Sequence, residues 1–286
     1  MPGGGGMPMI TGDWYFVDSN TGKDSAGSSG KNMTSPFATW EYAYDQCSAG
    51  DGVCLLPWHA ETITTQIDLD TIGVTSWGMM HGRTMPTITG NGAIDAVDVS
   101  AEGNMIGNIK FAAPLTDAQT ADINVDAANC TIYNTMHLGS VGTENKVDII
   151  VLTANADDVL IDGVRIYNTV VECPSAIKIE GALTNGEIRN CFVWDSIGWT
   201  NGAIYDAAIG TGLYIHHNVF KNAKAATVVM NFVANSTGIC SFNHISGRHT
   251  TLASNVVTGT GMDFFEHFGT EEASVTGIPN PVVEVD

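Results

Sequence analysis

Apolar residues recur along this chain at an interval of about 27 residues. The longest column is spaced by 26, 29, 27, 27 and 27 residues and consists of Ile106, Ile132, Ile161, Ile188, Ile215 and Phe242. A second column keeps a spacing of 27 throughout and consists of Ile123, Ile150, Ile177 and Ile204. A fixed period of this size is typical of repeat proteins, in which each unit is too small to bury its own apolar face.

Turn-type, polar and further apolar residues keep the same period. Two positions after the first column lie Asn108, Asn134, Gly163, Asn190, His217 and His244, and five positions after its first five members lie Phe111, His137, Ile166, Val193 and Phe220. A second turn column consists of Asn168, Asp195 and Asn222. Each unit therefore holds about three short strands, and we expect every strand to pair with its equivalent one unit away at ~4.8 Å.

These columns predict an all-β fold, a single parallel β-helix of about eight coils that covers residues 53–268. A β-propeller blade needs ~40–45 residues and four strands, and a leucine-rich repeat needs a Leu/Asn signature. The chain has neither pattern, so the β-helix is the repeat fold that fits.

The segments on either side of the repeats are less regular. Residues 1–12 contain a run of glycines and predict a flexible leader, and residues 269–286 predict a tail or cap. Residues 13–52 predict an initial strand at 14–17, a loop and a helix that begins at Ser35 and Pro36 and ends at Gly50. The helix places Phe37, Trp40, Tyr44 and Cys47 on one face, and we expect it to cap the open end of the β-helix.

Residues that follow the first column by one position should point outward, because neighbouring strand residues alternate between the two faces. This row consists of Gly107, Tyr133, Asp162, Arg189, His216 and Asn243. Its chemistry suggests a binding face whose candidate residues are Tyr133, Asp162, Arg189, Tyr214 and His216. The same pattern also fits an exposed ladder of ion pairs, worth up to ~1 kcal/mol per pair.

If the chain were a hydrolase, Asp162, Glu187, Asp206 and His216 would be the candidate catalytic residues. Glycoside hydrolysis needs two carboxyl groups ~5–5.5 Å apart for retention or ~6.5–9.5 Å apart for inversion. The pairs that would satisfy this are Asp162 with Glu187, or Glu187 with Asp206. The polar ladder explains these residues more simply, so the sequence assigns no catalytic residue and leaves enzymatic activity open.

We expect no cofactor and no metal ion. No acidic cluster resembles a calcium cage, and His216 and His217 should point to opposite faces if both lie on one strand. Three of the six cysteines, Cys130, Cys191 and Cys240, fall at positions expected to point inward. A disulfide between Cys47 and Cys54 is left open.

The balance of 31 acidic and 11 basic residues gives a formal net charge of −20. Such a surface repels nucleic-acid phosphates and anionic membranes, so we expect neither as a partner. No run of ~18 apolar residues predicts a membrane span. The first residues also lack the pattern of a secretory signal.

The N-terminal part of the chain resembles a known superfamily. The segments FVDSNTGKDS at 16–25, SPFATW at 35–40 and AGDGV at 49–53 are similar to the initial segment of right-handed parallel β-helix proteins of the pectin-lyase-like superfamily. The resemblance covers roughly residues 15–63 and implies the fold. The superfamily includes polysaccharide lyases, glycoside hydrolases, bacteriophage tail spikes and non-enzymatic phage virion proteins, so it does not fix the function.

From the compact repeats and the lack of a convincing catalytic group, the sequence favours a structural component of a bacteriophage particle. We expect a homotrimeric capsid decoration (cement) protein or small spike, made in the host cytoplasm and located in the virion beside partners such as the major capsid protein. The alternatives are a polysaccharide-degrading enzyme (a phage depolymerase, glycoside hydrolase or lyase) and a non-catalytic adhesin that binds a host-surface glycan.

Overall fold

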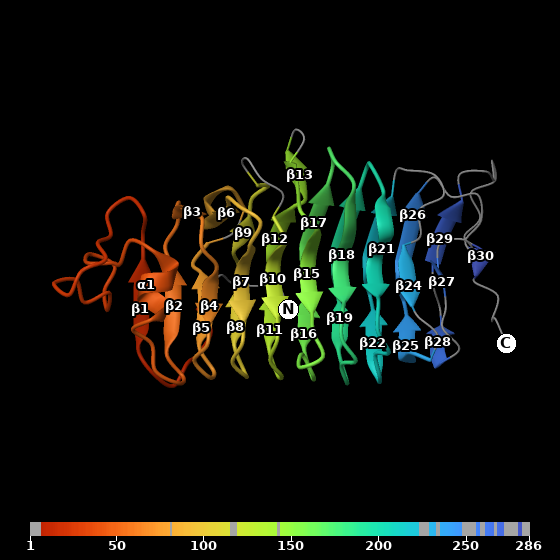
Figure 1. Ribbon diagram of the computed structural model, residues 1–286, viewed down its shortest axis with the longest axis horizontal. Coiled ribbons are helices and arrows are strands. Elements are labelled where there is room, and N and C mark those ends of the chain that lie inside the picture. Colours follow the sequence, from red (N-terminus) through yellow and green to blue (C-terminus); the bar gives the residue numbers. More distant parts are fainter. Residues whose placement is uncertain are drawn as a thin grey trace.

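The chain folds into a right-handed parallel β-helix that is elongated along its axis (Figure 1). The computed structural model describes residues 7–80, 82–114, 119–141, 144–222, 229–232, 235–247, 256–257, 261–265, 268–271 and 280–281. Strands β2 to β24 make seven coils of three strands, and strands β25 to β29 continue the stack. The fold predicted from the 27-residue period is therefore confirmed, with about seven coils rather than eight.

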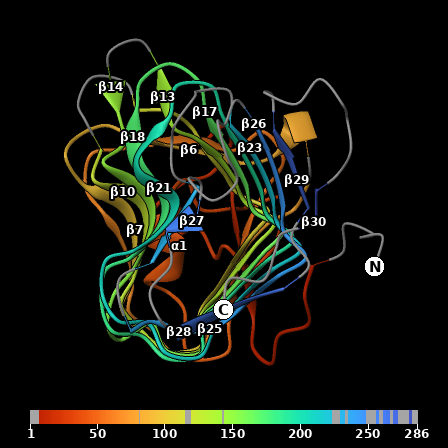
Figure 2. The same cartoon turned by 90° about the vertical axis from the view of Figure 1, so that its right-hand side faces the viewer.

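Three sheets form the sides of the coil, as the end-on view in Figure 2 shows. Sheet A contains, in order, β1 (Trp14–Val17), β2 (Gly52–Leu55), β5 (Thr75–Gly78), β8 (Met105–Gly107), β11 (Thr131–Tyr133), β16 (Leu160–Asp162), β19 (Glu187–Arg189), β22 (Leu213–His216), β25 (Thr237–Ser241) and β28 (Gly261–Phe265). Sheet B contains β3 (Ala60–Ile63), β6 (Thr87–Gly90), β9 (Lys110–Phe111), β12 (Met136–Leu138), β17 (Arg165–Asn168), β20 (Phe192–Asp195), β23 (Val219–Asn222), β26 (His244–Gly247), β29 (Phe268–Glu271) and β30 (Asn280–Pro281). Sheet C contains β4 (Ile67–Leu69), β7 (Asp95–Val99), β10 (Ala121–Val125), β15 (Asp148–Leu152), β18 (Cys173–Ile179), β21 (Trp199–Asp206), β24 (Met230–Phe232) and β27 (Val256–Val257).

One hairpin departs from this regular path. Strands β13 (Ser140–Val141) and β14 (Glu144–Asn145) pair antiparallel and stand out from the coil between sheets B and C (Figures 1 and 2). They interrupt the connection from β12 in sheet B to β15 in sheet C, whereas the described residues of the corresponding connections in the other coils form no strand.

The predicted apolar columns form the core. Ile132 lies opposite Ile106 and Ile161, and the register continues through Ile188 to Ile215. The second column is also in register from Ile123 to Ile204. These side chains are buried. Because burying one such side chain contributes roughly 1.5–3 kcal/mol, stacking supplies the stability that a single coil lacks.

The first column ends differently from the prediction. Cys240, not Phe242, lies opposite Ile215, because the intervening coil is two residues shorter than 27. Phe242 instead occupies the corner between sheets A and B with a φ of 54° and is 41% exposed. His244 is not a corner residue, since it pairs with Val219 in β26 and β23. The corner residues share a left-handed φ between 49° and 71° and are Asn108, Asn134, Gly163, Asn190, His217 and Phe242.

The predicted helix from Ser35 to Gly50 is wrong in its start and its length. The helix α1 spans Trp40–Tyr44, and the Thr39 side chain accepts a hydrogen bond from the Tyr42 N–H at its N-terminus. Phe37 cannot be helical because its backbone pairs with β1: its N–H donates to the Phe16 carbonyl over 2.9 Å. Phe37, Trp40 and Tyr44 are buried, and α1 packs against β1, β2 and β4.

All six cysteines are free thiols. Cys47 and Cys54 do not pair, and burial raises the pKa of each of these two thiols to about 12. Cys130, Cys191 and Cys240 are buried, as predicted. Within the described ranges, no helix is long and apolar enough to cross a membrane.

Candidate functional site

The outer face of sheet A carries a continuous row of polar and aromatic side chains. The row predicted from the sequence is in register from Gly107 through Tyr133, Asp162 and Arg189 to His216. Ser241 follows His216, so the expected position of Asn243 in this row is wrong, and Asn243 is buried. A second row two residues earlier on each strand brings Glu187 and Tyr214 side by side. We call the surface formed by Trp77, Tyr133, Asp162, Glu187, Arg189, Tyr214, His216, His217 and Phe242 the sheet A strip.

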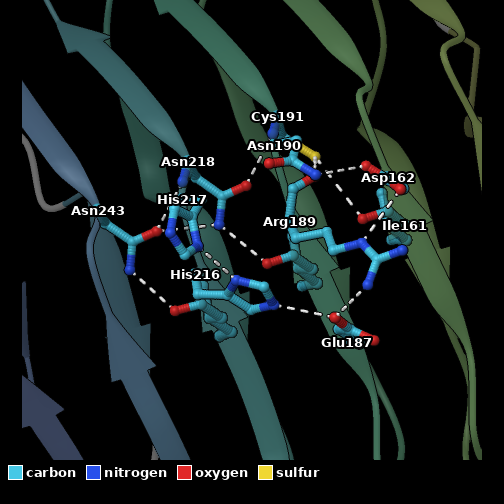
Figure 3. A network of polar contacts seen from close by, with 12 residues as sticks. Ile161, Asp162, Glu187, Arg189, Asn190, Cys191, His216, His217, Asn218 and Asn243 are labelled. Atoms are coloured by element: carbon cyan, nitrogen blue, oxygen red, sulfur yellow. Dashed lines mark hydrogen bonds and ion pairs between the residues drawn. The ribbon is translucent and has the colours of Figure 1, made fainter. Parts of the chain in front are cut away.

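Arg189 lies at the centre of the strip and joins two carboxylates (Figure 3). Its Nε donates to Asp162 Oδ2 over 3.1 Å, and its Nη1 donates to Glu187 Oε1 over 2.8 Å. The Asn190 amide donates to the other Asp162 oxygen over 2.8 Å. The side chains of Arg189 and Glu187 remain 34% and 29% exposed, so the cluster is open to solvent on one side.

Two histidines extend this network toward the next coil. His216 Nε2 lies 2.9 Å from Glu187 Oε1, and its Nδ1 lies 2.7 Å from His217 Nδ1. The network assigns the Nε2 proton to the bond with Glu187, which leaves His216 Nδ1 to accept from His217 Nδ1–H. Tyr214 stacks on His216 with ring centroids 3.9 Å apart. His216 is consequently 9% exposed, which corrects the expectation that it is an exposed residue.

Aromatic rings lie at both ends of the ionic cluster. Trp77 and Tyr133 stack at 5.7 Å although Gly107 separates them in the row. A Cβ at Gly107 would lie 2.2 Å from the Trp77 ring, so this stack requires glycine. At the other end His217 stacks on Phe242 at 5.1 Å, and Tyr214 and Phe242 are 38% and 41% exposed.

Electrostatics keep the central groups charged. Burial raises the pKa of Glu187, but hydrogen bonds from His216 and Arg189 outweigh it, so the pKa lies below its ordinary value of 4.5. Burial lowers the pKa of Arg189, but the hydrogen bonds to Asp162 and Glu187 raise it by more, so the pKa lies above its ordinary value. Glu187 is therefore an ionised acceptor near neutral pH and is not poised as a general acid.

One candidate hydrolytic pair, Asp162 and Glu187, lies on adjacent strands, and Arg189 bonds to both carboxylates. Asp206 lies in sheet C, is buried, and accepts a hydrogen bond from Ser236 Oγ. Burial raises the pKa of Asp206, which lies in a different sheet from Glu187.

The described residues contain no cluster of metal-ligating side chains. In those residues there is no group of three or more His, Cys, Asp and Glu side chains placed to hold a metal ion. His217 lies at a corner just after β22, with a φ of 56°, and its ring contacts the His216 ring instead of facing away from it.

A second aromatic surface on sheet B was not predicted. Tyr167 lies 5.9 Å from Phe192 and 6.1 Å from Trp194, with Arg165 and Lys221 in the same outward rows. In those two rows of sheet B, from β9 to β26, the described residues include no Asp or Glu. The sequence did contain a signal for this surface. The residues directly before and after Ile166 and Val193 must point outward, because the side chains of Ile166 and Val193 point inward.

Comparison with known proteins finds similar solved structures but no family. No protein-family model and no curated protein matches it. A rhamnogalacturonan lyase is similar over 83% of this chain and 75% of its own, at 12% identity and a TM-score of 0.47. GH136 lacto-N-biosidase from Eubacterium ramulus covers 90% of this chain and 67% of its own, at 11% identity and a TM-score of 0.43. PfbA, a surface adhesin of Streptococcus pneumoniae, covers 84% of both chains at 10% identity and a TM-score of 0.33. At this level of identity the similarity concerns the β-helix alone.

Proposed function

We propose that this β-helix binds an extended, uncharged glycan along the sheet A strip and does not cleave it. The observation that carries the proposal is the order of side chains along the axis, with aromatic rings at both ends of a hydrogen-bonding cluster. Tyr133 and Tyr214 are three coils apart, or roughly 14 Å at the strand spacing of a sheet. Aromatic rings offer flat apolar surfaces to sugar rings, and Arg189 with its carboxylates offers donors and acceptors to hydroxyl groups.

Charge favours an uncharged ligand. The cluster combines two carboxylates with one guanidinium, and the chain as a whole carries −20. An anionic polymer approaching this strip would be repelled both locally and by the whole molecule.

Binding without cleavage is inferred from the ionised state of the Glu187 carboxyl group. Hydrolysis of a glycosidic bond needs one protonated carboxyl to act as the acid. Glu187 is held ionised by Arg189 and His216, and Asp162 is bonded to Arg189 and Asn190. Glu187 therefore offers acceptor oxygens and is not available as that acid, which supports a glycan-binding adhesin over a hydrolase.

The test is a glycan array followed by titration calorimetry on the best ligand. Replacing Tyr214 with Ala should weaken binding by about tenfold or more, because a buried aromatic contact is worth more than ~1.4 kcal/mol at a binding hot spot. Tyr205→Ala is the matched control, since Tyr205 is half-buried on the outer face of sheet C.

Three results would count against the proposal. The first is an array without any binding, and the second is binding that Tyr214→Ala and Tyr133→Ala leave unchanged. If Trp194→Ala abolishes binding instead, the glycan lies on sheet B. The third is release of reducing ends from the bound glycan, lost in Glu187→Gln, which would make the protein an enzyme.

The predicted homotrimer, virion location and contact with a major capsid protein stay predictions. Mass in solution and localisation in an assembled particle test them, and both are compatible with glycan binding by the exposed strip.

A further inference from the structure

A cluster of fully buried polar side chains lies where sheets B and C meet beneath the β13–β14 hairpin. Asp122 comes from β10, His137 from β12, and Lys146 directly follows β14. Gln119 and Thr135 complete the cluster, and each of the five residues is at most 1% exposed. A lysine with no exposed surface is rare in a folded protein unless a partner accounts for it.

The contacts converge on one carboxyl group. Lys146 Nζ lies 2.6 Å from Asp122 Oδ2, and His137 Nδ1 lies 2.8 Å from the same oxygen. Gln119 Nε2 donates to the other oxygen, Asp122 Oδ1, over 3.1 Å. His137 Nε2 in turn lies 2.8 Å from Thr135 Oγ1, and its ring stacks flat on Phe111 at 5.0 Å. One amine, one carboxyl group, a proton carrier and an amide donor are therefore fixed in mutual contact.

We propose that Lys146 and Asp122 react with each other to form an intramolecular isopeptide bond. The inference is independent of glycan binding, since none of these residues belongs to the sheet A strip. An amine held at hydrogen-bond distance from a carboxyl group gains a large effective concentration, which reaches ~10⁵–10⁸ M in well-oriented intramolecular reactions. The reaction requires no cofactor, oxidant or second substrate.

The reaction begins with transfer of one proton from the Lys146 ammonium to Asp122 Oδ2, its partner 2.6 Å away. Burial lowers the pKa of Lys146, although Asp122 opposes the shift, and a free amine is the nucleophilic form. Burial also lowers the pKa of His137, so that its ring is neutral and able to both give and accept a proton.

The atoms of the condensation balance within the cluster. The Lys146 nitrogen forms a bond to Asp122 Cγ, and the Cγ–Oδ2 bond breaks. Of the three ammonium protons, one stays on the amide nitrogen and two leave with Oδ2 as water. His137 relays the second proton to Oδ2 through its 2.8 Å contact, while Gln119 stabilises the negative charge that develops on Oδ1.

The link would fasten the hairpin to the coil. It joins residue 122 in sheet C to residue 146 beyond the hairpin, and so closes a covalent ring through β11, β12, β13 and β14. The chain here is already bonded to the segment directly before β10, since the N–H groups of Val147 and Asp148 donate to the carbonyl groups of Gln119 and Thr120. The isopeptide bond would make this attachment permanent in the coil that departs from the regular path.

Intact-mass spectrometry of the full-length protein in denaturing solvent tests the proposal. The wild-type chain should be lighter than its sequence by one water, and digestion should yield a branched peptide that joins Lys146 to Asp122. Lys146→Arg keeps the positive charge but should restore the full mass. Asp122→Asn, if it condenses, should lose ammonia in place of water, which separates this reaction from dehydration elsewhere.

His137→Gln tests the proton relay and should slow the appearance of the lighter species by tenfold or more. The wild-type measurement alone decides the central claim, even if a variant does not fold. A wild-type mass equal to that of the sequence, in fresh protein and after prolonged incubation, overturns the proposal and leaves a buried ion pair. A loss of water that persists in Lys146→Arg overturns it as well.

Discussion

Two buried asparagines, Asn218 and Asn243, offer a quantitative test of how adjacent coils are held together. They lie directly after the corner residues His217 and Phe242 and are completely buried. Asn218 accepts from the Cys191 N–H over 2.9 Å and donates to the Ile188 carbonyl over 2.9 Å and to Asn243 Oδ1 over 3.0 Å.

The expected cost of each substitution follows from these bonds. The Asn218 side chain makes three hydrogen bonds. The Asn243 side chain also makes three hydrogen bonds with oxygen or nitrogen atoms. Its partners are the Ile215 carbonyl, the Asn218 N–H and the Asn218 side chain. At about 1 kcal/mol per bond, Asn218→Ala and Asn243→Ala should each lower the free energy of unfolding by about 3 kcal/mol. The double variant should lose about 5 kcal/mol, not 6, because the bond between the two side chains is counted once.

Urea unfolding followed by circular dichroism measures these differences, with an unchanged slope as evidence that the native state is intact. Asn155→Ala is the control, since Asn155 is exposed and bonds only to neighbouring turns, and it should change the free energy of unfolding by less than about 0.5 kcal/mol. Single variants that lose less than about 1 kcal/mol would refute the additive estimate. Strict additivity in the double variant would refute the coupling between coils.

Two further predictions concern the sheet A strip. Gly107→Ala should displace the Trp77 ring, because the nearest ring atom would lie 2.2 Å from the new Cβ, and it should lower the free energy of unfolding by ~1–3 kcal/mol. Near-ultraviolet circular dichroism reports the loss of the Trp77–Tyr133 stack, and an unchanged spectrum would contradict the prediction. The lowered pKa of Glu187 stabilises the folded state at pH values above 4.5, the ordinary pKa of the group, and this stability is lost as the pH falls through the pKa of the folded state. The acid branch of a stability–pH profile should therefore be shallower in Glu187→Gln. Equal slopes would disprove the ion-pair network.

The core of this fold could be read from the sequence because stacking repeats it. A side chain that points inward on one coil meets the equivalent side chain of the next at the strand spacing, so aliphatic residues such as Ile161, Ile188 and Ile215 recur at one interval. The same argument placed Asp162 and Arg189 on a common face, and the structure confirms their register. Alternation along a strand was enough for both conclusions.

The errors arise where chain length varies between coils. Counting 27 residues from Ile215 leads to Phe242, but the coil is shorter there and Cys240 fills the position. A better marker was the corner itself, because a left-handed residue directly follows six strands of sheet A, β8, β11, β16, β19, β22 and β25, although the lengths of these coils differ. Asn suits that conformation, and Phe242 does not, so the corner was invisible to a rule based on residue type.

The bounds of the helix and the contacts of the buried cluster could not be predicted from the periodicity of the sequence. Ser35 and Pro36 have the chemistry of a helix start, yet the pairing of Phe37 with β1 takes precedence over it. His137 keeps the repeat spacing, but its partners Asp122 and Lys146 come from another sheet and from a loop. Contacts between different sides of the coil have no fixed spacing in the sequence.

A parallel β-helix constrains any function on its faces in a specific way. Stacking favours like residues on neighbouring coils, since identical apolar or amide side chains pack well in register. A recognition surface needs the opposite, because a ligand distinguishes positions only where neighbouring coils differ. The sheet A strip departs from repetition at each step, with Tyr133, Asp162, Arg189 and His216 in one register. The inward column beside it remains isoleucine at every one of these coils. Variation on the outer face over a uniform inner face is what selection for a ligand would produce on this scaffold, and selection for stacking alone would not require it.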